Sequence, residues 1–148
     1  MTTIHDKAII LNDLANSYAM SLRYTKAIAR YKEALALYLS LAKKEPSNYG
    51  VAIAHVFSNL AIIHLNLHKF KEAEEFHKNS LKMHRVLVRH NYKKYAIGYA
   101  TCIMEGVHYL KQHALMLHEA EGLLHRFYGN PLAEQLLRAI KKLRESGK

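Results

Sequence analysis

Two segments of the chain repeat the same residue pattern at the same spacing, with an offset of 46 positions. Small side chains at helical spacing let two helices approach closely, and large side chains fill the spaces between them. One such hairpin cannot bury both of its faces, so the repeat predicts helical pairs that stack on one another. The matched positions are Leu14, Ala15, Tyr18, Ala27, Tyr31 and Ala34 in the first copy, and Leu60, Ala61, His64, Ala73, His77 and Ser80 in the second.

A third, weaker copy follows and needs one inserted residue. Its positions are Gly106, Val107, Leu110, Ala120, Leu124 and Phe127. The three copies lie at about 8–46, 49–91 and 93–128, and we expect helix pairs over 4–22 and 25–45, 49–67 and 69–89, and 93–111 and 115–128. Thr25 is the expected N-cap of its helix, and Pro46 and Gly50 are expected to mark the turn between copies. Asn130 and Pro131 begin a last amphipathic helix, 131–146, which is suited to cap the array.

The order of small and large residues resembles the tetratricopeptide repeat family. The 46-residue period is similar to the long repeats of the kinesin light chain type. The resemblance implies an all-α fold, a right-handed α-solenoid of three tetratricopeptide-like hairpins plus a C-terminal capping helix, in a single domain over 1–148. HEAT and armadillo repeats, with periods of about 40–47 residues, are the alternative fold.

The chain is strongly basic, with 22 Lys and Arg against 12 Asp and Glu and a net charge of +10. Such a balance suggests an acidic partner, nucleic acid or a membrane surface. The charge is spread evenly over the three copies, but the stretch 46–68 has no charged residue and 95–110 has only Glu105. One stripe on helix 69–89 is either a solvated outer face or a docking surface for a polyanion. Its residues are Lys78, Lys82, Arg85 and Arg89.

The first helix of each copy presents a nearly uncharged face dotted with Asn and His. In the tetratricopeptide family this face lines a concave groove for extended or helical peptides, and the resemblance implies the same here. The alternative is that the apolar members are core between copies. The candidates are Asn12, Asn16, His55, Ser58, Asn59, Ile62, Thr101, Met104, Glu105 and His108. A clamp for a C-terminal carboxylate is not expected, because Asn12, Thr101 and Glu105 fill its basic positions.

No pattern in the sequence indicates catalysis or a cofactor. Phosphate-binding glycine loops, nucleophile elbows and metalloprotease motifs are absent. His64 and His68 could share a helix face, but no local carboxylate or Cys completes a metal site. We therefore expect a protein that is not an enzyme and holds no metal or cofactor.

One uncharged stretch, 46–68, has the length of a membrane span. It contains His and Asn side chains that are costly in lipid, so a buried helix is the better interpretation. A single cysteine and an N-terminus without a signal-peptide pattern predict a cytoplasmic protein.

The function expected from these features is a non-catalytic protein–protein interaction module or scaffold. It would hold a partner segment in the groove formed by helices 4–22, 49–67 and 93–111. The alternatives are polyanion or nucleic-acid binding through the basic face, and a small secretion-type chaperone. Ala8, Ile9 and Ile10 give the first helix an apolar outer side, which leaves self-association open.

Overall fold

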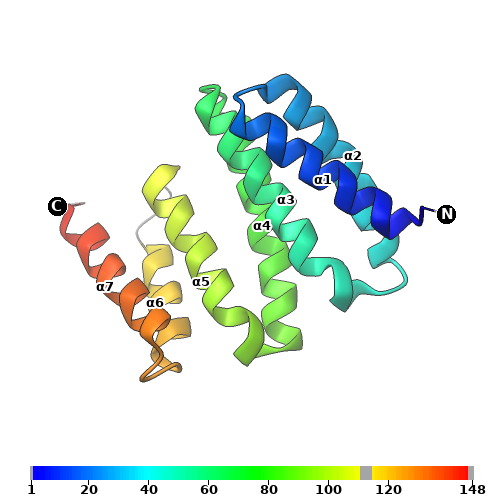
Figure 1. The fold of residues 1–148 in the computed structure, drawn as a ribbon. Coiled ribbons are helices and arrows are strands. Elements are labelled where there is room, and N and C mark those ends of the chain that lie inside the picture. The colour runs from blue at the N-terminus through cyan, green and yellow to red at the C-terminus, as the bar shows by residue number, and fades with distance from the viewer. Residues whose placement is uncertain (1, 111–114, 147–148) are drawn as a thin grey trace. The chain divides into compact units, whose positions relative to one another are not determined.

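Helices make up nearly all of the chain that the structure describes. The computed structural model describes residues 2–110 and 115–146, and within these ranges it contains seven helices and no strand (Figure 1). The expected all-α helical repeat is therefore confirmed. The helices are α1 (Ile4–Met20), α2 (Tyr24–Ala42), α3 (Pro46–Asn66), α4 (Phe70–His90), α5 (Tyr92–Tyr109), α6 (Leu115–His125) and α7 (Pro131–Ser146).

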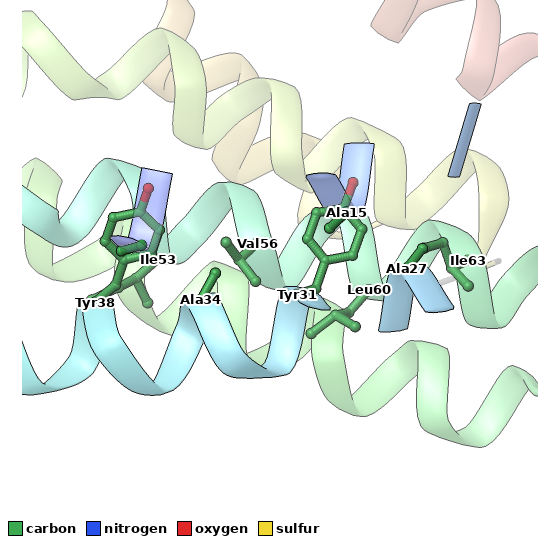
Figure 2. Close-up of a cluster of buried hydrophobic side chains, with 10 residues drawn as sticks. Ala15, Ala27, Tyr31, Ala34, Tyr38, Ile53, Val56, Leu60 and Ile63 are labelled. Carbon is green, nitrogen blue, oxygen red and sulfur yellow. The ribbon is translucent and has the colours of Figure 1, made fainter. Parts of the chain in front are cut away.

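The chain forms two compact units, Met1–Met83 and His84–Lys148, and the division falls within α4. In the first unit α2 packs against both α1 and α3. Figure 2 shows side chains of α2 and α3, among them Tyr31 and Leu60, gathered in one buried cluster. Burial of these apolar side chains is the main source of stability for a hairpin stack.

The small residues of the repeat lie where two helices approach each other. In both of the first two copies they are almost completely excluded from solvent, at 5% exposure or less. The positions are Ala15, Ala27 and Ala34, and their equivalents Ala61, Ala73 and Ser80. Ser80 keeps its hydroxyl satisfied by donating a hydrogen bond to the carbonyl oxygen of Ala54 at 2.9 Å, which ties α4 to α3.

The turns inside the first two hairpins have the same geometry. Leu22 (φ 61°) and His68 (φ 58°) both adopt a left-handed backbone, and they are 46 positions apart. The amide of Arg23 donates to the carbonyl oxygen of Tyr18 at 2.8 Å, and the amide of Lys69 donates to that of His64 at 2.8 Å. This is the Schellman pattern of helix ends, so the sequence repeat is also a structural repeat.

Some helix ends differ from those expected. The second helix begins at Tyr24, with Arg23 as its cap residue, so the prediction of Thr25 as N-cap was wrong. Pro46 lies in the first turn of α3, and Gly50 lies within that helix rather than in the turn. Proline suits this place because the first-turn amide has no partner in the helix. The predicted cap of α7 is confirmed, because the Asn130 side chain accepts a hydrogen bond from the amide of Ala133 at 3.0 Å.

In the second unit α6 packs against both α5 and α7, and α5 also contacts α7. Its core includes Ile103 of α5, Leu124 of α6 and Ile140 of α7, all fully buried. The sequence spacing predicts that α7 has an apolar stripe of Leu132, Leu136, Ile140 and Leu143. The buried side of the helix is rotated slightly from this stripe, because Ala133 is buried whereas Leu132 is 50% exposed. An amphipathic helix with a charged outer face thus closes this unit, as expected for a capping helix.

Among the described helices, only α3 has the length and hydropathy that a membrane span requires. Length and composition are a weak criterion, since the core helix of a folded domain also meets them. Of its most apolar stretch, 44% is buried inside the molecule. Ile53 and Leu60, which are fully buried, belong to this helix and to the core shown in Figure 2.

Candidate functional site

The two candidate amides of α1 are partly used inside the first hairpin. The Asn16 side-chain oxygen accepts a hydrogen bond from the Tyr31 hydroxyl of α2. The Asn12 side-chain oxygen is buried and has no hydrogen-bond partner among the described residues. The Asn16 side chain therefore joins α1 to α2. Both asparagines are half-buried, so only part of each side chain is available to a partner.

On α3 the candidates fall into exposed and internally bound groups. His55 is exposed, Asn59 is half-buried, and Ile62 is 50% exposed, so Ile62 is not a core residue of the described chain. Ser58, in contrast, shares a hydrogen bond of 2.9 Å with Ser80 of α4. The surface that α3 offers to a partner thus consists of His55, Asn59 and Ile62.

The α5 candidates lie around one cavity. Its volume is about 490 Å³, and its other wall is the inner side of α7. Thr101, Met104, Glu105 and His108 all line it, so the structure brings together the four residues that the sequence predicted for the third copy. Leu136, Ala139, Lys142 and Leu143 of α7 complete most of the opposite wall. A pocket of this size, mostly apolar with a few polar groups, is typical of a binding site.

Glu105 gives this cavity its most unusual chemistry. Its carboxylate is half-buried, and within residues 2–110 and 115–146 it makes no hydrogen bond or ion pair. Burial raises the pKa of the Glu105 carboxyl above its ordinary value. Lys142 and His108 lie at the same cavity and are exposed to solvent. The cavity therefore combines apolar walls, an unpaired acid and a basic rim.

The ten candidates are divided between the two units. Those of α1 and α3 belong to the unit Met1–Met83, and those of α5 belong to the unit His84–Lys148. The part played by α7 was missed in the sequence, where this helix was interpreted only as a cap. The apolar stripe of α7 could have indicated this role, because its residues Leu136 and Leu143 line the cavity.

The basic stripe of α4 is not uniform. Lys78, Lys82 and Arg89 are exposed, whereas Arg85 is half-buried. The Arg85 side chain donates a hydrogen bond of 2.8 Å to the Tyr99 hydroxyl and lies over the Tyr99 ring. Arg85 therefore serves packing within the second unit, and three exposed charges remain for a docking surface.

Tyr99 of α5 links this arginine to α6. Its hydroxyl donates a hydrogen bond to the Glu119 carboxylate at 2.7 Å. Burial raises the pKa of Tyr99 to about 12, an effect that the hydrogen bond to Glu119 increases and the hydrogen bond from Arg85 opposes. The Arg85–Tyr99–Glu119 chain joins three helices of the unit through hydrogen bonds that involve charged groups.

The two histidines at the aromatic positions of the second copy, His64 and His77, are buried. The His64 ring lies 4.9 Å from that of Phe76, and its Nδ1 is 2.7 Å from the carbonyl oxygen of Leu60. His77 is almost completely buried, and burial lowers its pKa below the ordinary value of 6.5. In the described part of the chain, no three His, Cys, Asp or Glu side chains come together as metal ligands would.

On the first helix, Ala8 is buried whereas Ile9 and Ile10 are 39% and 58% exposed. Self-association through this side of α1 stays a prediction.

Residues 53–89 match the family model of the tetratricopeptide repeat, and this segment covers most of α3 and α4. A search of curated proteins gives no significant match.

Proposed function

We propose that this chain, whose residues 53–89 match the tetratricopeptide repeat family, is a non-catalytic module that binds a partner protein with the first helices of its repeats. Repeats of this family are generally protein–protein interaction modules and typically lack catalysis. The family match therefore supports the class of function. The surfaces of α3 and α5 support the proposed location of the binding site.

One observation carries the proposal. The four candidates of the third copy, chosen from sequence register alone, line a single apolar cavity of about 490 Å³ with α7. Roughly 300–1,000 Å³ is the usual range of binding pockets, and apolar walls favour burial of a partner's side chains. On α3, the exposed Ile62 with His55 and Asn59 beside it offers a second contact surface for the same kind of partner.

The test is affinity capture with the full chain at low and at high salt, followed by variants of two surfaces. The groove variant is Thr101→Arg with His108→Ala, and the matched basic variant is Lys78→Ala with Lys82→Ala. Salt does not weaken apolar burial, so a groove partner is expected to remain bound at high salt and to be lost with the groove variant only. Equal helix content and melting temperature in both variants serve as the folding control.

The competing function is polyanion binding through Lys78, Lys82 and Arg89, which are exposed on α4 in a chain of net charge +10. Affinity for nucleic acid falls steeply with salt because binding releases condensed counterions. A partner that is lost at high salt and with the basic variant, but is retained by the groove variant, would contradict the proposed function and favour this one.

A further inference from the structure

The cavity between α5 and α7 combines apolar walls with a carboxylate, and this combination indicates what kind of side chain could bind there. Of the ten described residues that line it, Glu105 is the only acid, and most of the others present carbon atoms. Met104 and Leu136 lie on the two opposite helices, so an aliphatic chain that enters the cavity would contact both walls. Such a chain would also pass near the Glu105 carboxylate.

Glu105 is the feature that the fold itself leaves unexplained. A half-buried carboxylate loses part of its hydration, and a cationic partner normally offsets that loss. Elsewhere in the described chain two carboxylates have such partners: Arg30 lies 2.8 Å from Glu33, and Arg144 pairs with Glu121. Lys142 lines the same cavity without forming an ion pair with Glu105. With respect to residues 2–110 and 115–146, the Glu105 carboxylate is therefore available to a cation from outside the chain.

From this charge complementarity we propose that the cavity receives an arginine side chain of a partner segment, with Glu105 as its counter-ion. This inference rests on the proposed function and names the chemistry of the partner. Arginine suits the site better than a compact cation, because its long stem buries carbon against Met104 and Leu143 while its planar head can pair with a carboxylate. The exposed ring of Tyr109 at the cavity edge offers a face for the guanidinium.

The volume of the cavity indicates a peptide rather than an isolated cation. About 490 Å³ exceeds the space of one arginine side chain and leaves room for an apolar neighbour. Lys142 is exposed, so its flexible stem can turn its charge to solvent when the arginine enters. Removal of that like charge is expected to strengthen binding.

The test uses the full chain and an acetylated, amidated pentapeptide Ala-Leu-Arg-Leu-Ala. Its matched probe carries the neutral isostere citrulline in place of arginine, and n-butylguanidinium serves as the small cation. Binding is followed by amide chemical shifts in NMR titrations. We expect the arginine peptide to shift amides of 101–109 and 136–146, and the citrulline peptide to bind about tenfold more weakly, because a charge-assisted hydrogen bond is lost.

Three variants make the test specific. Glu105→Gln is expected to weaken the arginine peptide to the level of the citrulline peptide, and Lys142→Gln is expected to strengthen it. Glu134→Gln changes the net charge by the same amount on the exposed side of α7 and is expected to leave the affinity unchanged. An unchanged affinity in Glu105→Gln would overturn the proposal.

The remaining outcomes are also decisive. Equal binding of the arginine and citrulline peptides would mean that the cavity recognises apolar side chains only. Binding of n-butylguanidinium as tightly as the peptide would identify a small-cation site. Failure of both peptides to shift the cavity amides would overturn the arginine proposal. In each of these cases, loss of the captured partner in the Thr101→Arg, His108→Ala variant would leave the proposed function intact.

Discussion

A substitution of His77 gives the most specific prediction about stability, because the residue at the equivalent position of the first copy has a hydrogen-bond partner and His77 Nε2 has none among the described residues. It occupies the position that Tyr31 fills in the first copy, where the tyrosine hydroxyl donates to the side chain of Asn16. The residue 46 positions after Asn16 is Ile62, which has no hydrogen-bonding side chain. His77 Nε2 is accordingly buried with no hydrogen-bond partner among the described residues.

The change His77→Phe keeps an aromatic ring and removes this unpaired nitrogen. A buried polar group without a partner costs about 1–3 kcal/mol. The larger six-membered ring costs part of that gain through overpacking, although Tyr31 shows that the equivalent position accepts such a ring at 2% exposure. We therefore expect the free energy of unfolding to rise by about 1 kcal/mol at neutral pH.

The gain depends on pH in a defined direction. Because burial lowers the pKa of His77 in the folded state, the unfolded chain takes up a proton at this residue more readily. The wild type thus loses stability as the pH falls below 6.5. The His77→Phe variant does not lose this part of the free energy of unfolding, because it has no histidine to protonate at this position. The advantage of the variant is expected to grow at acid pH.

The assay is denaturant unfolding of both proteins at a pH above 6.5 and at one below it. His118→Phe, at an exposed position of α6, is the control for loss of a histidine and should change neither the stability nor its pH dependence appreciably. If His77→Phe is less stable than the wild type at both pH values, with the same pH dependence, the assignment of an unpaired buried histidine is refuted.

Three further predictions concern folding, and each is measured by denaturant unfolding. Leu22→Gly and His68→Gly should each stabilise the chain by about 0.5–1 kcal/mol, because glycine adopts the left-handed turn conformation without strain; destabilisation would argue against that backbone. Leu60→Ala should cost about 3 kcal/mol, whereas Ile62→Ala should change the stability by less than about 0.5 kcal/mol; similar costs would contradict their different burial. Tyr99→Phe should cost about 1–3 kcal/mol, because Arg85 and Glu119 lose their shared partner; no loss would mean that the bridge adds nothing.

The repeat architecture could be predicted from the sequence because close helix packing demands small residues at fixed positions. Ala27 and Ala73 are fully buried, as that reasoning requires. The hairpin turns followed the same 46-residue period, down to the left-handed residues Leu22 and His68. Helix ends were predicted less well. Thr25 is the residue type that caps helices best, yet the helix begins one residue before it without any side-chain cap.

The candidate site could be predicted only where helical periodicity places residues on one face. The α5 candidates share one face of one helix, and the structure places all four of them at one cavity. Helical periodicity does not show which residue a polar side chain will form a hydrogen bond with. Asn16 is engaged by Tyr31 and Ser58 by Ser80, both across a helix interface. Arg85 belongs to the basic stripe by spacing but bonds to Tyr99 of another helix. These pairings depend on tertiary packing.

The most direct test of the central claim is to map the segment of a captured partner on the full chain by amide chemical shifts. If the partner binds at the proposed surfaces, the largest shifts are expected in 101–109 and 136–146, around the cavity, together with shifts near Ile62 on the exposed face of α3. Shifts confined to the surroundings of Lys78, Lys82 and Arg89 would contradict it and would assign binding to the basic face of α4.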